Sequence, residues 1–257
     1  MRLVSLNLWG GRAYNKLTEF VESEKLRTDI FCFQEVLDLK TGDIDPEVKA
    51  AIEEYQKSGR KQELNLYSSL RDLLTGFESF LSEPYSQGAE RLAIFARKEL
   101  KAQVEVLKVH RKIDVILHDK PFWVSCIMQH AQIKRGTLSY DIAQLHGLWQ
   151  GGGKADTPER LEQSKTINKL MSKFGERKVL CGDFNLDINT ESVRMLEDSM
   201  TDLIRTHRIT TTRSTLAPAR KGKIADYVFV SDKIKVNDFE LPETEASDHL
   251  PLCLDFE

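Results

Sequence analysis

The sequence lacks three features that would each point to a particular class of protein. No apolar run approaches the roughly 20 residues that span a bilayer, so we expect no transmembrane segment. Residues 1–7 turn polar too soon for a secretory signal, so a cytoplasmic location is expected. No C-x-x-C pair is present, and the cysteines are scattered in apolar runs, which favours buried reduced thiols over disulfides or zinc ligands: Cys32, Cys126, Cys181 and Cys253.

The chain also lacks a large excess of charge of either sign. Its 37 basic and 40 acidic residues give a formal net charge of -3, so the whole molecule does not attract nucleic acid or anionic membranes. A hydrophobic fraction of 40% and a length of 257 residues suffice for a substantial core. No linker-like stretch divides the sequence, so we predict a single domain over residues 1–257. No feature indicates a protein partner.

Apolar and alternating runs predict strands from one end of the chain to the other. The predicted strands are residues 3–8, 29–36, 92–97, 103–109, 122–133, 137–146, 178–181, 225–230 and 252–256. Capping residues and helical stripes predict helices at residues 14–25, 46–57, 157–174 and 191–200. Helices separate the early strands, whereas the middle strands form a meander. We therefore predict an α/β (α+β) protein of packed sheets covered by helices.

Polar side chains stand at the ends of several predicted strands. Asn7 and Glu35 each follow buried runs, and His146 ends a strand before a glycine-rich stretch. Taken singly, these residues also fit a buried amide, a solvated strand end and a mobile loop. A buried polar group is costly unless it is hydrogen-bonded or binds a ligand, so a functional role is the alternative. The imidazole suits proton transfer near neutral pH.

The C-terminal half adds a denser set of such residues. Gly-Asp-Phe-Asn follows a strand at residues 182–185, and Ser-Asp-His-Leu-Pro occupies residues 247–251. An aspartate beside a histidine fixes its tautomer, so Asp226 or Asp248 is expected near His249. Each residue alone could cap a turn or a strand. Together with the upstream sites, the set indicates a metal-assisted phosphoester hydrolase.

Six segments resemble, in order, the motifs of the endonuclease/exonuclease/phosphatase superfamily. They are Leu-Asn-Leu-Trp at 6–9, Phe-Gln-Glu-Val at 33–36, Leu-His-Gly-Leu at 145–148, Gly-Asp-Phe-Asn at 182–185, Ala-Asp-Tyr-Val-Phe-Val at 225–230 and Ser-Asp-His-Leu-Pro at 247–251. The resemblance implies a four-layer α/β/β/α sandwich of two packed mixed β-sheets flanked by helices. It also implies a hydrolase in which Mg²⁺ or Mn²⁺ assists in-line attack of water on a phosphodiester or phosphomonoester.

The resemblance assigns roles to individual residues. It implies a divalent cation held by Glu35, with Asn7 beside it and Asp248 assisting. It implies catalytic roles for five residues: His146, Asp183, Asn185, Asp226 and His249. In that reading Asp183 orients or activates water, and Asn185 binds a phosphate oxygen. One departure from the family pattern is Gln144-Leu145, where many members read Asn-Thr before the histidine.

The paired roles of the two histidines follow from the same resemblance. His249 with Asp226 acts as base or oxyanion stabiliser. His146 binds phosphate or assists the leaving group, and Glu90 is expected as its partner at the substrate site.

A basic segment precedes the Asp226 strand. No acidic residue occurs between Asp202 and Asp226, whereas the segment contains Arg205, Arg208, Arg213, Arg220, Lys221 and Lys223. One hypothesis is that Arg220, Lys221 and Lys223 bind further phosphates of the substrate; a solvated loop is the alternative.

Three functional readings stay open. A small-molecule or lipid-head-group phosphatase suits the mild acidity, and a nuclease suits the basic segment. A catalytically silent phosphate-binding module on the same fold is the third. Such a module would be expected to have lost Glu35, Asp183 or His249, and all three are present.

Overall fold

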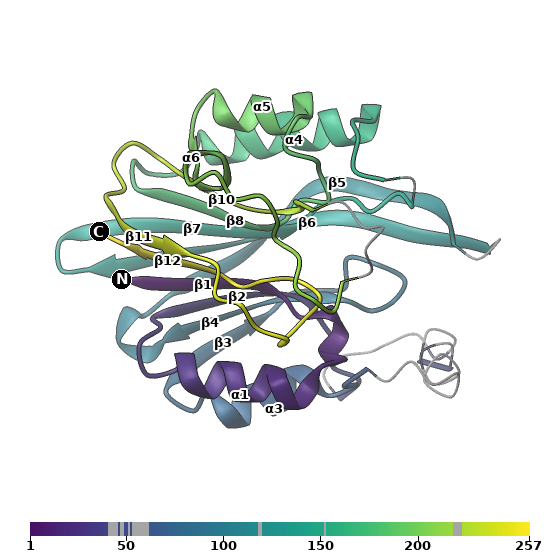
Figure 1. The fold of residues 1–257 in the computed structure, drawn as a ribbon, viewed down its shortest axis with the longest axis horizontal. Coiled ribbons are helices and arrows are strands. Elements are labelled where there is room, and N and C mark those ends of the chain that lie inside the picture. The colour runs from purple at the N-terminus through teal and green to yellow at the C-terminus, as the bar shows by residue number, and fades with distance from the viewer. Residues whose placement is uncertain are drawn as a thin grey trace.

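The computed structural model describes residues 1–40, 46, 49–50, 52, 62–117, 120–151, 153–217 and 223–257. These residues form two packed sheets with helices on both outer faces, as predicted (Figure 1). One sheet is covered by α1 (Tyr14–Glu24) and α3 (Leu66–Leu73). The other is covered by α4 (Pro158–Met171), α5 (Glu191–Glu197) and α6 (Leu203–Thr206). None of the helices in these ranges has the length and apolar character of a membrane-spanning segment.

The first sheet has the strand order β11-β12-β1-β2-β4-β3. Its strands are β1 (Arg2–Asn7), β2 (Ile30–Val36), β3 (Phe77–Leu81), β4 (Arg91–Arg97), β11 (Val236–Glu240) and β12 (Leu252–Phe256). β1 pairs in parallel with β2 and antiparallel with β12, so the last strand lies beside the first. Two short 3₁₀ helices follow β1 and β4: η1 (Trp9–Gly11) and η2 (Lys98–Leu100).

The second sheet has the strand order β5-β6-β7-β8-β10-β9. Its strands are β5 (Gln103–Leu117), β6 (Lys120–Arg135), β7 (Leu138–His146), β8 (Lys178–Asp183), β9 (Thr201–Asp202) and β10 (Asp226–Val230). The hairpin expected between residues 122–133 and 137–146 is confirmed as the antiparallel pair β6–β7. β7 and β8 are parallel, so this sheet is mixed as well.

Several elements differ from the expectations. The helices α4 and α5 end three residues earlier than predicted, and β5 continues well beyond residue 109. The edge strands β3 and β11 and the helix α3 were not predicted. Both edge strands carry charged, partly exposed side chains, so their apolar pattern is weak. The helix expected at residues 46–57 falls mostly outside the described residues.

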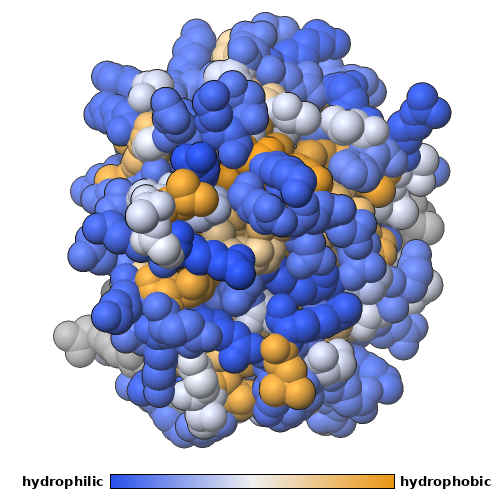
Figure 2. All heavy atoms as spheres, turned by 90° about the vertical axis from the view of Figure 1, so that its left-hand side faces the viewer, coloured by the Kyte–Doolittle hydropathy of each residue, from blue (hydrophilic) through white to orange (hydrophobic). Residues whose placement is uncertain are grey.

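The strand register brings the polar strand ends to one edge of the sandwich. Parallel pairing aligns Asn7 with Gln34 on the first sheet and His146 with Asp183 on the second. Antiparallel pairing places Asp226 directly opposite Asp183. The other end of the sandwich, which carries both chain termini, presents mainly hydrophilic residues with separate apolar groups between them (Figure 2). Because the polar strand ends gather at the edge where β1, β2, β7 and β8 end, we expect the catalytic site there.

Two glycines allow the ends of β7 and β8 to approach closely. A Cβ atom at Gly182, where φ is +133°, would lie 2.1 Å from the carbonyl oxygen of Leu145. A Cβ atom at Gly147 would lie 2.2 Å from the carbonyl oxygen of Phe184. Any side chain at either position would push apart the backbones that carry His146 and Asp183.

We predict that Gly182→Ala lowers the free energy of unfolding by about 3 kcal/mol or more, because a backbone clash adds to an unfavourable φ. Urea denaturation followed by circular dichroism measures the change. Gly136→Ala is the matched control, since φ is +62° there but nothing lies within 4 Å of the added Cβ. The control should lose only about 1–2 kcal/mol, the cost of the left-handed conformation. Equal losses in the two variants would contradict the close-approach argument.

Candidate active site

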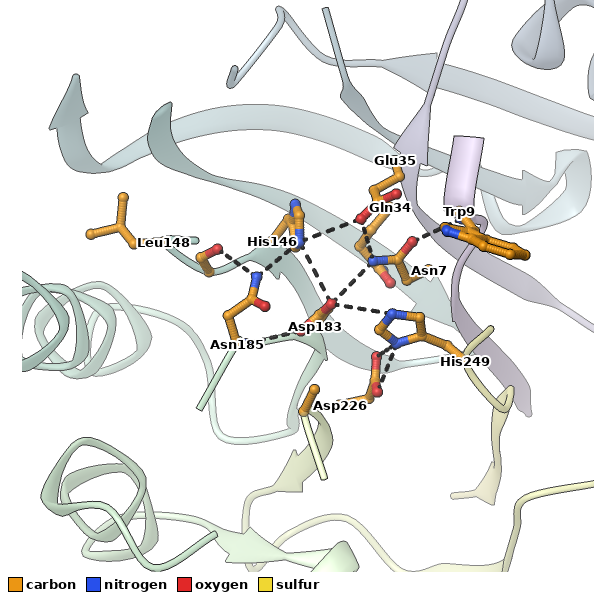
Figure 3. Close-up of polar contacts among 12 residues, drawn as sticks. Asn7, Trp9, Gln34, Glu35, His146, Leu148, Asp183, Asn185, Asp226 and His249 are labelled. Atoms are coloured by element: carbon orange, nitrogen blue, oxygen red, sulfur yellow. Dashed lines mark hydrogen bonds and ion pairs between the residues drawn. The ribbon is translucent and has the colours of Figure 1, made fainter. Parts of the chain in front are cut away.

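The carboxylate of Asp183 is the centre of the polar cluster at this edge (Figure 3). Its Oδ2 accepts a hydrogen bond from Asn7 Nδ2 on the facing sheet at 3.1 Å, and its Oδ1 accepts one from the Asn185 backbone at 2.9 Å. The Nε2 atoms of His146 and His249 lie 3.6 and 3.7 Å from the same Oδ2. Side chains from both sheets thus converge on one buried carboxylate.

The surroundings of Asp183 keep it ionised. Burial alone would raise the pKa of this carboxyl group. The interaction with His146 and the proximity of His249 and Lys154 outweigh burial, and the pKa is held well below its ordinary value. Asp183 is therefore a permanent acceptor for N–H or O–H groups in the pocket.

Glu35 reaches the pocket from an irregular end of β2. The pairing with β4 shifts register between Phe33 and Val36, and Glu35 has a φ of +53°. Such a conformation is unfavourable for a residue with a side chain and persists only where the surroundings impose it. Tyr85 Oη accepts the Glu35 backbone N–H at 3.1 Å, and Asn7 Nδ2 donates to Glu35 Oε1 at 3.0 Å. The Glu35 side chain is 23% exposed, so it is partly accessible to solvent, unlike the side chain of Asp183 at 2%.

His249 is oriented by Asp226, one of the two aspartates expected beside it. Its Nδ1 lies 2.8 and 2.9 Å from the two carboxylate oxygens of Asp226. The Asp226 carboxylate is fixed in turn by the Thr212 hydroxyl, which donates to Oδ2 at 2.6 Å. Asp248 lies on the other side of the ring, with Oδ1 at 3.7 Å from His249 Nε2. The contacts place a proton on Nδ1 and leave Nε2 facing Asp183.

His146 faces the same carboxylate from β7. Asn185, which also has a positive φ of +54°, brings its Nδ2 to 3.0 Å from His146 Nε2 and donates to the Gly147 carbonyl at 3.1 Å. Burial opposes the charged imidazole, but the nearby acids, Asp183 foremost, raise its pKa above the ordinary value. The Tyr85 ring packs edge-on against the imidazole at 5.0 Å between centroids.

Glu90 lies near this histidine but does not bond to it. Its carboxylate accepts a hydrogen bond from the Ser86 hydroxyl, and the described contacts include no hydrogen bond or ion pair between Glu90 and His146. Burial and the charge of Glu35 raise the pKa of Glu90. The charge of Glu90 is among those that raise the pKa of His146, and the expected role of Glu90 as the partner of His146 stays a prediction.

The basic segment before β10 is split by the fold. Arg205 points to an ion pair with Glu197 at 2.5 Å, away from the strand ends. Lys223 is exposed, and Arg220 and Lys221 lie outside the described residues. Arg213 is different, because its guanidinium contacts Asp248 and His249 in the pocket.

Sequence reasoning missed a row of buried amides beneath the pocket. Gln34 Nε2 donates to Gln144 Oε1 at 2.8 Å between the two sheets, and Gln144 Nε2 donates to Gln129 Oε1 at 2.9 Å. Gln144 is the residue at which the chain departs from the family pattern. Its place inside an apolar strand was the available signal, since a buried amide needs partners. Arg213, Thr212 and Tyr85 left no comparable signal.

The donor set fits a hard divalent cation. Glu35 Oε1 and Asp183 Oδ2 accept hydrogen bonds from the same Asn7 nitrogen, at 3.0 and 3.1 Å, so two carboxylates from opposite sheets flank this amide group. Such oxygen ligands are those that Mg²⁺ and Mn²⁺ prefer. Asp183, Asp226 and His249 also offer atoms within 4.8 Å of one another. His249 is the weaker candidate, because Asp226 and Arg213 already engage its two ring nitrogens.

Comparisons with solved structures show that the fold is shared with other proteins. An endonuclease/exonuclease/phosphatase family protein from Bacteroides vulgatus superposes with a TM-score of 0.68 at 18% identity, covering 100% of this chain and 98% of the other. The mannosyl-6-phosphatase Bt3783 of Bacteroides thetaiotaomicron gives a TM-score of 0.66 at 18% identity, with coverages of 100% and 99%. ANGEL2, described as a 2',3'-cyclic phosphatase, gives a TM-score of 0.69 at 13% identity, with coverages of 100% and 94%.

At these identities the structural likeness shows the shared fold alone. The search of curated proteins found no match. The family model described as "Endonuclease/Exonuclease/phosphatase family" matches residues 4–249, nearly the whole length. Its members hydrolyse phosphoester bonds, which agrees with a pocket of carboxylates, amides and imidazoles. The chain belongs to the endonuclease/exonuclease/phosphatase family.

Proposed function

We propose that the protein is a divalent-metal-dependent hydrolase in which water attacks a phosphoester in line. The observation that carries this proposal is the convergence of Asn7 and Glu35 from one sheet with His146, Asp183 and His249 around one pocket. In-line phosphoryl transfer needs a positioned water, a proton acceptor and donors for the phosphoryl oxygens. This pocket contains a group for each task.

Asp183 and His249 position and activate the water. Their Oδ2 and Nε2 atoms are 3.7 Å apart, so one water oxygen about 2.8 Å from each fits between them. The Nδ1–H group of His249 donates a hydrogen bond to Asp226. The lone pair on Nε2 can therefore accept a proton from that water. The water oxygen bonds to phosphorus while the ester P–O bond breaks, and its electron pair stays on the leaving oxygen.

Asn185 and His146 face the phosphoryl group from the β7 side. The Asn185 amide donates to a phosphoryl oxygen, and His146 binds a second oxygen or donates a proton to the leaving oxygen. Glu35, with Asn7 and Asp248, would hold a Mg²⁺ or Mn²⁺ ion, which would supply neutralisation of the phosphoryl charge. Burial and nearby acids raise the pKa of the Tyr85 phenol well above its usual value, so it stays a neutral support for Glu35 and His146.

The charge balance favours a small phosphoester as substrate. The formal net charge is -3, and Arg205 of the basic segment is neutralised by Glu197. Proteins of this fold include a mannosyl-6-phosphatase and a 2',3'-cyclic phosphatase by name. Sugar phosphates, lipid head groups and cyclic phosphodiesters are therefore the first classes to test, with nucleic acid as the competing class. Arg220, Lys221 and Lys223 are proposed to meet further phosphates of such a substrate.

We further propose a single domain over residues 1–257 and a cytoplasmic location. The four cysteines are free and buried, as expected for a reducing compartment.

The test is a substrate panel run with Mg²⁺ or Mn²⁺ and then with excess chelator. It includes p-nitrophenyl phosphate, bis(p-nitrophenyl) phosphate, sugar and inositol phosphates, glycerophosphodiesters, a 2',3'-cyclic nucleotide and supercoiled plasmid. We predict hydrolysis of at least one class, loss of at least about 99% of the rate with chelator, and recovery on adding the metal back. No hydrolysis of any class would favour the silent binding module, and hydrolysis unaffected by chelator would contradict the metal requirement.

A further inference from the structure

Arg213 is held at the pocket by its backbone. Arg213 forms an isolated antiparallel β-bridge with His249, and the neighbouring Ser214 N–H donates to the Asp248 carbonyl at 3.1 Å. The Ser214 hydroxyl also donates to the Ser247 carbonyl at 2.5 Å. These contacts fasten residues 211–214 to the histidine segment and fix the backbone position of the arginine.

The guanidinium of Arg213 touches the atom that the mechanism uses as base. Its Nη1 donates to His249 Nε2 and, at 3.3 Å, to Asp248 Oδ2. The side chain is only 9% exposed. Its Nε is buried with no hydrogen-bond partner among the described residues. Among the described residues, the side-chain contacts of Arg213 thus use Nη1 and leave the Nε donor unused.

The hydrogen bond from Arg213 to His249 is a weak interaction, but it shows which ring nitrogen of His249 is the acceptor. Arginine can only donate, so His249 Nε2 must be the acceptor in this contact, which agrees with the proton on Nδ1 facing Asp226. A neutral imidazole is a poor partner for a buried cation. A phosphoryl oxygen is a much stronger one, because the planar guanidinium fork matches its geometry and charge.

We propose that Arg213 is a catalytic residue that binds a non-bridging oxygen of the substrate phosphoryl group beside His249. The proposal rests on the hydrolase function proposed above and adds a residue to it. When substrate binds, the guanidinium exchanges the imidazole for the phosphoryl oxygen, and Asp248 keeps it in place. His249 Nε2 is then free to accept the proton of the attacking water. Arg213 itself forms and breaks no covalent bond.

Arg205 provides a matched comparison. It belongs to the same basic segment, but its guanidinium is engaged outside the pocket by Glu197 at 2.5 Å and by the Ile188 carbonyl at 2.7 Å. A general contribution of positive charge from the segment would affect both arginines. A role in phosphoryl binding is specific to Arg213.

The experiment compares wild type, Arg213→Ala, Arg213→Lys and Arg205→Ala in two assays with Mg²⁺ present. The first measures kcat and KM for bis(p-nitrophenyl) phosphate, or for p-nitrophenyl phosphate if only the monoester is hydrolysed. The second measures binding of inorganic phosphate by calorimetry. We expect Arg213→Ala to lower kcat about 10²–10³-fold, the effect of removing one donor to a developing oxyanion. Phosphate affinity should fall about tenfold or more, because the charged fork is lost.

Chemical rescue separates a direct role from a structural one. Methylguanidinium should restore at least about a tenth of the lost rate to Arg213→Ala, whereas methylammonium should not, since only the planar fork replaces the missing group. Arg213→Lys should be intermediate in both assays, and Arg205→Ala should match wild type. Circular dichroism checks each fold, and Arg213→Lys decides if Arg213→Ala does not fold.

The outcomes are distinct for the two proposals. Arg213→Ala with wild-type kcat and phosphate affinity overturns the role of Arg213 while leaving the hydrolase intact. A loss of rate that methylguanidinium does not rescue, with unchanged phosphate affinity, overturns it as well. A wild type that hydrolyses no class of the substrate panel but binds phosphate through Arg213 overturns the hydrolase and leaves the phosphoryl contact standing. A wild type that hydrolyses no class of the panel and does not bind phosphate overturns both.

Discussion

Asp183→Asn should lower kcat by about 10³–10⁴-fold on any ester that the wild type hydrolyses, and Asp183→Ala should abolish hydrolysis. Among the described residues, Asp183 is the one carboxylate that lies within 4 Å of both histidines, and it also accepts a hydrogen bond from Asn7 on the facing sheet. Asparagine keeps the shape of the side chain but presents an N–H where the water needs an acceptor. The isosteric change should therefore remove chemistry without removing the fold. Initial rates at saturating substrate, with circular dichroism of each variant, measure the effect.

The matched control for Asp183→Asn is Asp141→Asn. Asp141 is also buried and also faces a histidine, with Oδ1 at 2.7 Å from His130 Nε2, but it lies within β7 rather than at the strand end. Loss of the Asp141 charge should reduce the stability of the fold and leave kcat within about twofold of the wild-type value, as for other changes away from reacting groups. An Asp183→Asn variant that keeps more than about a tenth of the wild-type rate would contradict the assigned role.

His249→Ala is the second change with a large expected effect, a fall in kcat of about 10²–10⁴-fold. The variant lacks the base at Nε2 and leaves the Asp226 carboxylate held only by Thr212 among its described side-chain partners. Because the variant lacks only the imidazole ring, added imidazole should restore part of the rate. Rate measurements against imidazole concentration test this directly.

His130→Ala is the control for His249→Ala, since His130 forms an equivalent buried pair with Asp141 away from the strand ends. It should keep the wild-type rate and show no response to imidazole. The assignment of His249 as base fails if His249→Ala retains full activity, or if both variants lose activity equally.

The sequence was a good guide wherever buried strands carry the site. Asn7, Glu35, His146 and Asp183 each end a run of apolar residues, and such runs are visible without a structure. Parallel pairing then forces the strand ends to one edge. The edge strand β11 was missed because its exposed positions carry charge, which masks the apolar alternation.

The parts of the site that depend on tertiary pairing could not be read from the sequence. Arg213 looks like any other member of a basic run until its segment bridges His249. Tyr85 has no motif around it, yet it supports both Glu35 and His146. Glu90 was expected as a partner of His146, and its charge is among those that raise the pKa of His146, but its hydrogen bond from the Ser86 hydroxyl had no signal in the sequence.

A calorimetric titration with Mn²⁺ tests most directly whether the two sheets build one cation-binding pocket, because it needs no substrate. We predict that the wild type binds Mn²⁺ and that Glu35→Gln weakens binding by about tenfold or more. Glu105→Gln should bind like the wild type, since Glu105 pairs with His130 on the second sheet instead. A wild type that does not bind Mn²⁺, or a Glu35→Gln variant that binds it equally well, would contradict the account.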